Sequence, residues 1–156
     1  MPKLDLEALP AHTGCNYPDP FREVCLAATW RKLGDAAGLS DFGVNLVRLP
    51  PGKWSSQRHW HTAEDEFVWV LEGELVLVDE AGEHRLGPGD ACAWKAGAPD
   101  AHHLQNRSNR DAVYLEVGSR RPDADACDYP DIDMVARPQE RFYRRRDGTP
   151  YPPQES

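Results

Sequence analysis

Two histidines separated by one residue, His59 and His61, lie in a stretch that we expect to form a β-strand. Successive side chains of a strand point to opposite faces, so both imidazoles face the same side, with Cβ atoms about 7 Å apart at a rise of about 3.3 Å per residue. Two imidazoles at this spacing can bind one metal ion. Four residues separate His61 from Glu66, and a turn there would place the Glu66 carboxylate on the antiparallel neighbouring strand, opposite both histidines.

A second histidine pair, His102 and His103, lies downstream. His102 has the same strand parity as Leu104 and Asn106, so if that face is the interior one, His102 faces the metal and His103 points away. Three imidazoles and one carboxylate, with positions left open for water or substrate, suit one divalent transition metal: iron, manganese, nickel, copper or zinc. An isolated His-x-His pair is more often a surface or core pair, but its combination with a glutamate and a later histidine favours a metal site.

Four further residues are candidates for lining a pocket around this metal or for supporting its ligands. Gln57 has the strand parity of His59 and could orient a ligand or contact substrate, although a structural hydrogen bond is an equal alternative. Arg48 lies near the expected entrance and could bind a carboxylate or phosphate, or it could be a solvated rim residue. Trp94 and Leu104 could form part of the wall.

The elements that must position these residues are short strands. Fourteen prolines and twelve glycines punctuate the chain, and short apolar runs between turns predict an all-β domain. We expect strands at 24–29, 44–49, 53–61, 66–71, 74–79, 83–86, 91–94, 102–106 and 112–117, and a loop with one helical turn at 32–43. Strands this short and this closely spaced are typical of a sandwich or a barrel.

The predicted strand at 66–71 is apolar on both faces. Val68 and Val70 have the parity of Glu66 and would line the interior, whereas Phe67 and Trp69 would face the other way. A strand that is apolar on both faces is covered on both, by the other sheet or by a partner subunit. Together with the apolar surface of the terminal arms, this pattern predicts a homodimer.

The two histidine regions resemble the two sequence motifs of the cupin superfamily. Gly52…His59-x-His61-x4-Glu66-x6-Gly73 is similar to the first motif, and Gly89-Asp90…Gly97…His102-x3-Asn106 is similar to the second. The resemblance covers roughly residues 43–118. It implies an all-β, double-stranded β-helix (a jelly roll, or cupin-like barrel) with N- and C-terminal arms. It also implies that one metal ion is bound inside the barrel by His59, His61, Glu66 and His102.

The second motif departs from the family pattern just before the histidine pair. Four residues, rather than two, separate Gly97 from His102. The insertion leaves a choice between His102 and His103 as the third imidazole. The spacing to Asn106 and the strand parity both favour His102.

The resemblance also indicates how the chain is organised. We expect one domain over residues 1–156, with the barrel at about 43–118 and flanking arms at 1–42 and 119–156. The C-terminal arm is rich in proline, aspartate and arginine but contains enough aromatic residues to pack onto the barrel. We expect one short strand in it, near Arg141–Arg144.

Composition and charge exclude several classes of partner. Lysine and arginine number 18 against 26 aspartates and glutamates, a formal net charge of −8. Nucleic acid phosphates and an anionic membrane surface would repel such a chain. The apolar runs are too short for a transmembrane helix and the first residues lack the apolar region of a secretory signal, so we expect a cytoplasmic protein. The four cysteines lie far apart and predict neither a zinc site nor a disulfide framework.

Two classes of function fit these observations. The first is a metalloenzyme, of dioxygenase or isomerase type, that acts on a small molecule. The second is a non-catalytic small-molecule-binding protein, a sensor or an accessory protein. Related folds support many reactions, and no nucleophile or further acid–base pair stands out in the sequence, so the reaction must be inferred from the site.

Overall fold

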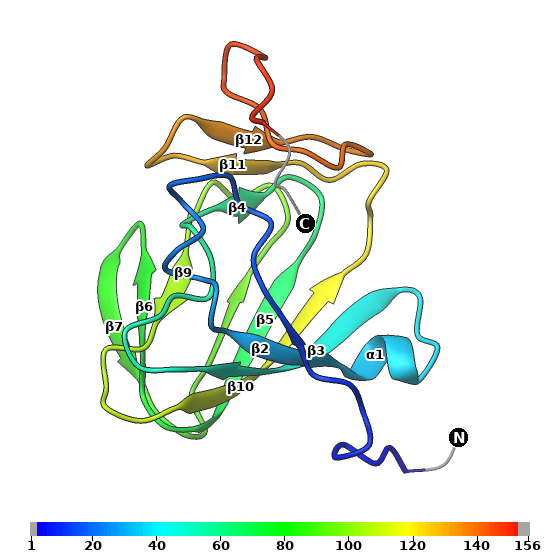
Figure 1. The fold of residues 1–156 in the computed structure, drawn as a ribbon, viewed down its shortest axis with the longest axis vertical. Helices are drawn as coiled ribbons and strands as arrows, with labels where there is room; N and C mark the ends of the chain where they lie inside the picture. Colours follow the sequence, from blue (N-terminus) through cyan, green and yellow to red (C-terminus); the bar gives the residue numbers. More distant parts are fainter. Residues whose placement is uncertain (1–2, 153–156) are drawn as a thin grey trace.

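The computed structural model of the protein describes residues 3–152, and its framework is a double-stranded β-helix, or jelly roll (Figure 1). The larger sheet has six strands in the order β1-β2-β3-β10-β5-β8. These strands are β1 (His12–Thr13), β2 (Thr29–Lys32), β3 (Phe42–Leu49), β10 (Ala112–Ser119), β5 (Glu66–Glu72) and β8 (Ala91–Trp94). Facing it is a three-stranded sheet of β7 (Gly82–Leu86), β6 (Leu75–Asp79) and β9 (His103–Gln105). All pairings are antiparallel.

A third sheet lies across one end of the barrel. It contains β4 (Trp60–His61), β11 (Cys127–Tyr129) and β12 (Met134–Ala136), so the second histidine of the His-x-His pair belongs to it (Figure 1). The register pairs Cys127 with His61 and Asp128 with Trp60. The C-terminal segment therefore contacts the His-x-His segment directly. Within residues 3–152, no helix is long and apolar enough to cross a membrane.

The barrel core lies between the two facing sheets. Val70 from β5 and Leu75 from β6 are 0% and 1% exposed, and they belong to one cluster with Leu49, Leu77 and Tyr114. Along β5 the burial alternates with the two-residue period of a strand, because every second side chain faces the opposite sheet. Burying a side chain such as valine contributes about 1.5–3 kcal/mol, so this face fixes the register of β5.

The strands predicted between residues 44 and 117 are present within two residues of their expected ends, apart from the stretch at 53–61. In that stretch only β4 is a strand, while Trp54 and His59 form single bridges with Gln105 and His102. The segment changes partner from β9 to β11 at this point, so no continuous ladder forms. The predicted loop with one helical turn contains α1 (Leu33–Ala36).

The strand predicted at 24–29 is wrong. Residues 21–27 form successive turns, with Cys25 N–H donating to the Arg22 carbonyl, and β2 begins only at Thr29. The apolar residues of this stretch serve a different purpose, because Val24 and Cys25 pack in a second core cluster with Tyr17 and Tyr129.

The strand predicted near Arg141–Arg144 is also wrong. The ladder of the C-terminal arm lies earlier, in β11 and β12, and Arg144 forms only isolated bridges to Val135 and Pro150. A turn follows at once, in which Gly148 N–H donates to the Arg145 carbonyl, so no strand continues past Arg144. The expected packing of aromatic residues is present in the second core cluster.

Candidate metal centre

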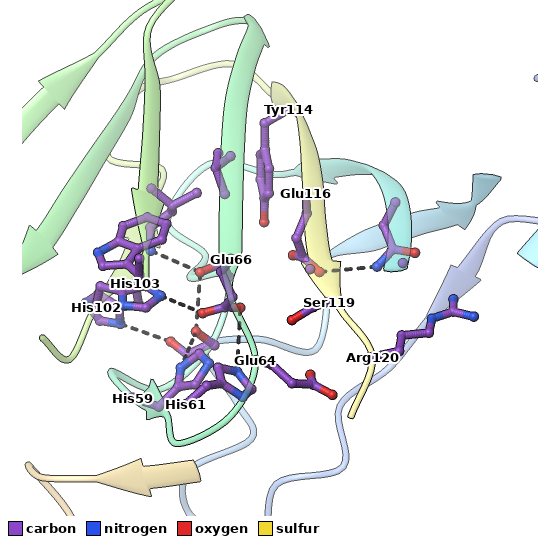
Figure 2. A pocket seen from close by; sticks show the side chains of 18 of the residues that line it. His59, His61, Glu64, Glu66, His102, His103, Tyr114, Glu116, Ser119 and Arg120 are labelled. Atoms are coloured by element: carbon purple, nitrogen blue, oxygen red, sulfur yellow. Dashed lines mark hydrogen bonds and ion pairs between the residues drawn. The ribbon is translucent and has the colours of Figure 1, made fainter. Parts of the chain in front are cut away.

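A cavity of about 410 Å³ lies inside the barrel, between the larger sheet and the two histidine regions (Figure 2). Its lining combines apolar side chains of the core with a set of polar and charged ones. The polar and charged lining residues are Asn45, Ser55, Ser56, His59, His61, Glu64, Glu66, His102, His103, Glu116, Ser119 and Arg120.

Three of the four predicted ligands form a tight group. His59, His61 and Glu66 each offer one ligand atom, and these atoms all lie within 4.8 Å of one another. The His61 Nε2 atom is 3.5 Å from Glu66 Oε1, and the rings of His59 and His61 have centroids 5.0 Å apart. The structure therefore brings the His-x-His pair and the glutamate to one point.

The fourth predicted ligand, His102, lies against the same carboxylate. Its Nε2 atom is 2.8 Å from Glu66 Oε2, and the residue is only 5% exposed. The Trp94 indole stacks on the His102 ring with centroids 3.6 Å apart and planes 6° apart. Stacking fixes the plane of the imidazole, so Trp94 both lines the cavity and holds His102 in place.

Main-chain carbonyls set the tautomers of two of the imidazoles. The His59 Nδ1 atom lies 2.9 Å from the Gln57 carbonyl oxygen, and the His102 Nδ1 atom lies 2.9 Å from the Asp100 carbonyl oxygen. A carbonyl only accepts, so each Nδ1 carries the proton and donates it. Nε2 is then the atom of each ring that could bind a metal ion, and at His102 the metal would replace the hydrogen bond from Nε2 to Glu66 Oε2.

For His61, the acceptor that holds the Nδ1 proton is a carboxylate rather than a main-chain carbonyl. The Nδ1 atom of His61 donates to Asp125 Oδ2 at 2.6 Å, and the Ala63 N–H donates to the other oxygen of Asp125 at 2.8 Å. Cys127 Sγ lies 3.3 Å from the same Nδ1 atom. A carboxylate behind a histidine fixes the ring and raises its basicity as a ligand. Neither Asp125 nor Cys127 was a sequence-based candidate.

The electrostatics of the cluster suit a cation. Burial lowers the pKa of His59 to about 4, so this ring is neutral at pH 7. Burial alone would raise the pKa of Glu66, but the His102 hydrogen bond and the other imidazoles lower it to about 2. Burial opposes protonation of His61, but its contacts with Cys127 and Glu66 raise its pKa to about 10. A metal ion bound to this ring would have to displace that proton, so metal uptake would release protons.

His103, the alternative to His102, has both ring nitrogens occupied. Its Nδ1 atom donates to the Ser56 carbonyl at 2.9 Å, and its Nε2 atom accepts from the Gln105 side-chain amide at 2.9 Å. The ring also lies edge-on to Trp54, with centroids 4.7 Å apart. His102, rather than His103, therefore faces Glu66.

The structure separates the other predicted pocket residues into two groups. Leu104, like Trp94, lines the cavity. The Gln57 side chain instead donates to the Phe21 carbonyl at 2.7 Å, so it supports the N-terminal arm, and only its main chain orients His59. Arg48 lies outside the cavity lining, with its side chain 54% exposed and paired with Asp111.

Three charged residues that the sequence analysis did not select line the cavity: Glu64, Glu116 and Arg120 (Figure 2). Glu116 belongs to β10, whose sequence is otherwise apolar from Ala112 to Val117. It has the strand parity of buried Tyr114, so a glutamate at an interior position was the signal that could have identified it. Glu64 and Arg120 lie in connections and gave no comparable signal.

The chain belongs to the cupin superfamily. The family model described as the cupin domain matches residues 45–118. The chain is 46% identical to a sugar phosphate isomerase of the cupin superfamily from Silicibacter pomeroyi, whose crystal structure superposes with a TM-score of 0.90 and with 96% of each chain covered.

Two more distant relatives differ in their described roles. A candidate sugar phosphate isomerase from Acidithiobacillus ferrooxidans is 34% identical, with a TM-score of 0.66, over 76% of this chain and 70% of that one. An oxalate-binding protein from Thermotoga maritima is 34% identical over 71 residues, which are 46% of this chain. The match spans 56% of the length of that curated relative.

Proposed function

We propose that the protein is a metal-dependent isomerase that acts on a small, polyhydroxylated carbonyl compound of the sugar phosphate class. The observation that carries this proposal is a polar cavity with three imidazoles and a carboxylate at one side, in a chain that aligns over 96% of its length with a sugar phosphate isomerase. Of the two enzyme classes that the sequence predicts, this similarity favours the isomerase over the dioxygenase.

His59, His61, Glu66 and His102 would bind one divalent transition metal, which can be iron, manganese, nickel, copper or zinc. The donor set fits such an ion, because the three Nδ1 atoms have acceptors and the Nε2 atoms of His61 and His102 face a single carboxylate. When bound, the metal supplies a Lewis acid that polarises a carbonyl oxygen.

The remaining cavity groups suit a hydroxylated substrate. Asn45, Ser119 and the carboxylates of Glu64 and Glu116 can exchange hydrogen bonds with sugar hydroxyl groups. Among the described lining residues, Arg120 is the only lysine or arginine, and its guanidinium is also paired with Asp35. A terminal phosphate would lie nearest to Arg120, at one side of the cavity.

The second candidate function is a non-catalytic binding protein, and the similarity to an oxalate-binding protein favours it. The negative charge of the cavity argues against oxalate, which is a small dianion. Glu64, Glu66 and Glu116 all line the cavity, so two carboxylates besides the proposed ligand would oppose a dicarboxylate. A polyol with one terminal phosphate avoids this repulsion, because it places neutral hydroxyl groups beside the glutamates.

The proposal is tested by exchange and turnover in deuterated water. The protein is loaded in turn with manganese, iron, nickel, copper and zinc, and each form is incubated with aldose and ketose phosphates of three to six carbons. We expect NMR to show conversion between an aldose and a ketose phosphate, with loss of the signal from the exchanged C–H, and no conversion by His61→Ala. Calorimetric binding of oxalate without turnover of any sugar phosphate would favour the binding protein instead.

We also propose that the protein is a homodimer that pairs through the outer face of β5. Phe67, Trp69 and Leu71 on this face are 39%, 47% and 37% exposed, and the adjacent Ala91 and Ala93 of β8 are exposed as well. Contiguous apolar surface of this kind marks association sites. Light scattering at micromolar concentration is expected to give twice the mass of one chain, and a monomeric mass would contradict the dimer.

A further inference from the structure

Glu116 is a carboxylate in the cavity that the metal cluster does not use. It lies on β10, paired across the sheet with Asn45 of β3 and Val68 of β5. Its carboxyl group is turned into the same cavity as Glu66 (Figure 2). Among residues 3–152, two groups of side chains could hold a metal ion, His59–His61–Glu66 and His61–Asp125–Cys127, and Glu116 belongs to neither. A second carboxylate therefore lies beside the proposed metal site without being one of its ligands.

Glu116 is held in place on one side and open on the other. Its Oε1 atom accepts a hydrogen bond from the Asn45 side-chain amide at 3.2 Å. For Oε2, no hydrogen-bonding or ion-pair partner is found in the described part of the chain, and this oxygen is not among the buried polar atoms that lack a partner. Oε2 therefore keeps some accessible surface, and Glu116 is one of the residues that line the cavity.

The other groups around the cavity are less suited to accept a proton from carbon. Glu66 is the proposed ligand. Glu64, like Glu116, accepts one hydrogen bond, but it lies in the connection before β5, whereas Glu116 is held within the sheet. Tyr114 is 1% exposed, and burial raises the pKa of its phenol well above the usual range, so it stays protonated. Burial and the charge of Glu66 raise the pKa of Glu116, which makes its ionised form a stronger base than an exposed glutamate.

We propose that Glu116 is the catalytic residue that transfers the proton between C1 and C2 of the substrate, an inference that rests on the proposed isomerase function. The Glu116 carboxylate takes the proton from C2 of an aldose, the C–H electron pair forms the C1=C2 bond, and the π pair of the C1=O bond moves onto O1 to give an enediolate. The O2 hydroxyl proton passes to O1 through solvent. The Glu116 carboxyl then returns its proton to C1 and a carbonyl forms at C2. Only hydrogens move, so the step needs no oxidant or co-reactant.

The test compares Glu116→Gln with Glu72→Gln, a matched change of an exposed glutamate of β5 that does not line the cavity. Each purified protein is loaded with the metal that supports turnover. Metal content, thermal melting, calorimetric affinity for the sugar phosphate, and C2 proton exchange in deuterated water are then measured. Glu116→Asp, which keeps the carboxyl group one methylene further back, is the variant for partial rescue.

We expect Glu116→Gln to keep one metal per chain, a melting temperature no lower than that of the wild type, and an affinity for the substrate within about threefold. Its rate of C2 exchange should fall about 100-fold or more, the usual contribution of a positioned acid–base group. Glu72→Gln should leave the rate unchanged, and Glu116→Asp should recover part of the lost rate.

Two results would overturn the assignment of Glu116 while leaving the proposed function intact. One is a wild-type protein that isomerises its substrate beside a Glu116→Gln variant whose exchange rate is within threefold. The other is loss of bound metal in Glu116→Gln, which would make Glu116 part of the metal site. A wild-type protein that exchanges no C2 proton with any metal and any sugar phosphate overturns both proposals, so the two failures are distinguishable.

Discussion

The two faces of strand β5 carry different chemistry on one backbone. The inner face places Glu66 at the candidate metal centre and buries Val68 and Val70, which are 5% and 0% exposed. The outer face carries Trp69, which is 47% exposed, with apolar neighbours on either side. In most sheets with one solvated face, the polar residues lie outside. Here the ionised group is inside, where three imidazoles surround it, and apolar side chains lie outside, where we propose a second protomer covers them.

Residue type alone therefore does not identify the core residues of this protein. Val70 and Trp69 are adjacent and both apolar, yet only Val70 is packed on all sides. Alternation along the strand decides which side chain contributes to folding and which remains available for association.

Shortening a side chain should cost much more on the inner face than on the outer face. We expect Val70→Ala to lower the free energy of unfolding by about 2–3 kcal/mol, because it removes packed methyl groups and leaves a cavity. Leu71→Ala, at a position that is 37% exposed, should cost less than about 1 kcal/mol at protein concentrations where the chain is monomeric. Urea unfolding measures both, and equal losses would contradict the separation of the faces.

Asp125 of the C-terminal arm is expected to contribute to metal affinity, because it holds the ring of the proposed ligand His61. Asp125→Asn keeps the shape of the group that accepts from His61 Nδ1 at 2.6 Å but removes its charge. We expect metal affinity to fall about 10–100-fold, the usual effect of losing such a partner behind a histidine ligand. Competition with a chelator of known affinity measures the change. Asp128→Asn, at an arm residue paired with Arg146 rather than with a histidine, is the control and should leave affinity unchanged.

The outer face is expected to control assembly with little effect on the fold of one chain. Trp69→Asp should convert a dimer to a monomer in light scattering, because it places a charge in the proposed apolar interface. Metal content should stay at the wild-type level, since the proposed ligands lie on the other side of the strand. A variant that still has the dimer mass would show that this face is not the interface.

The smallest expected effect is a pH-dependent change in stability when Glu116, on the cavity side of β10, is replaced by glutamine. Burial, with the charge of Glu66, raises the folded-state pKa of Glu116, so the folded protein holds this proton more tightly than the unfolded chain. The wild type therefore loses stability as pH rises above the unfolded value of about 4.3, whereas Glu116→Gln carries no such charge. The stability advantage of the variant over the metal-free wild type should grow from pH 5 to pH 8 in thermal melting.

The sequence was sufficient to predict the fold class and that His59, His61 and Glu66 lie close together. A two-residue period places both histidines on one face, and a four-residue turn brings the glutamate opposite them. These relations are local, so they can be deduced from spacing. The choice between His102 and His103 was harder, because it depends on partners such as Gln105 and the Ser56 carbonyl, which the fold brings to His103.

The sequence did not reveal the residues that reach the site from distant parts of the chain. Asp125 lies 64 positions from His61 and approaches it only because β11 pairs with β4. The C-terminal strands have little apolar alternation, and their pairing is decided by packing on Tyr17 and by the register with the histidine segment. Contacts of such long sequence separation carry no local pattern, so the arm was predicted to pack but not where it would contact the site.

The central claim, a metal centre built on the inner face of β5, is tested most directly by elemental analysis. Purified wild-type protein is measured by mass spectrometry beside His59→Ala/His61→Ala, with circular dichroism to verify that both are folded. The account predicts about one divalent transition metal ion per wild-type chain and almost none in the variant. Equal metal content in the two proteins, or none in the wild type after reconstitution with each metal, would contradict it.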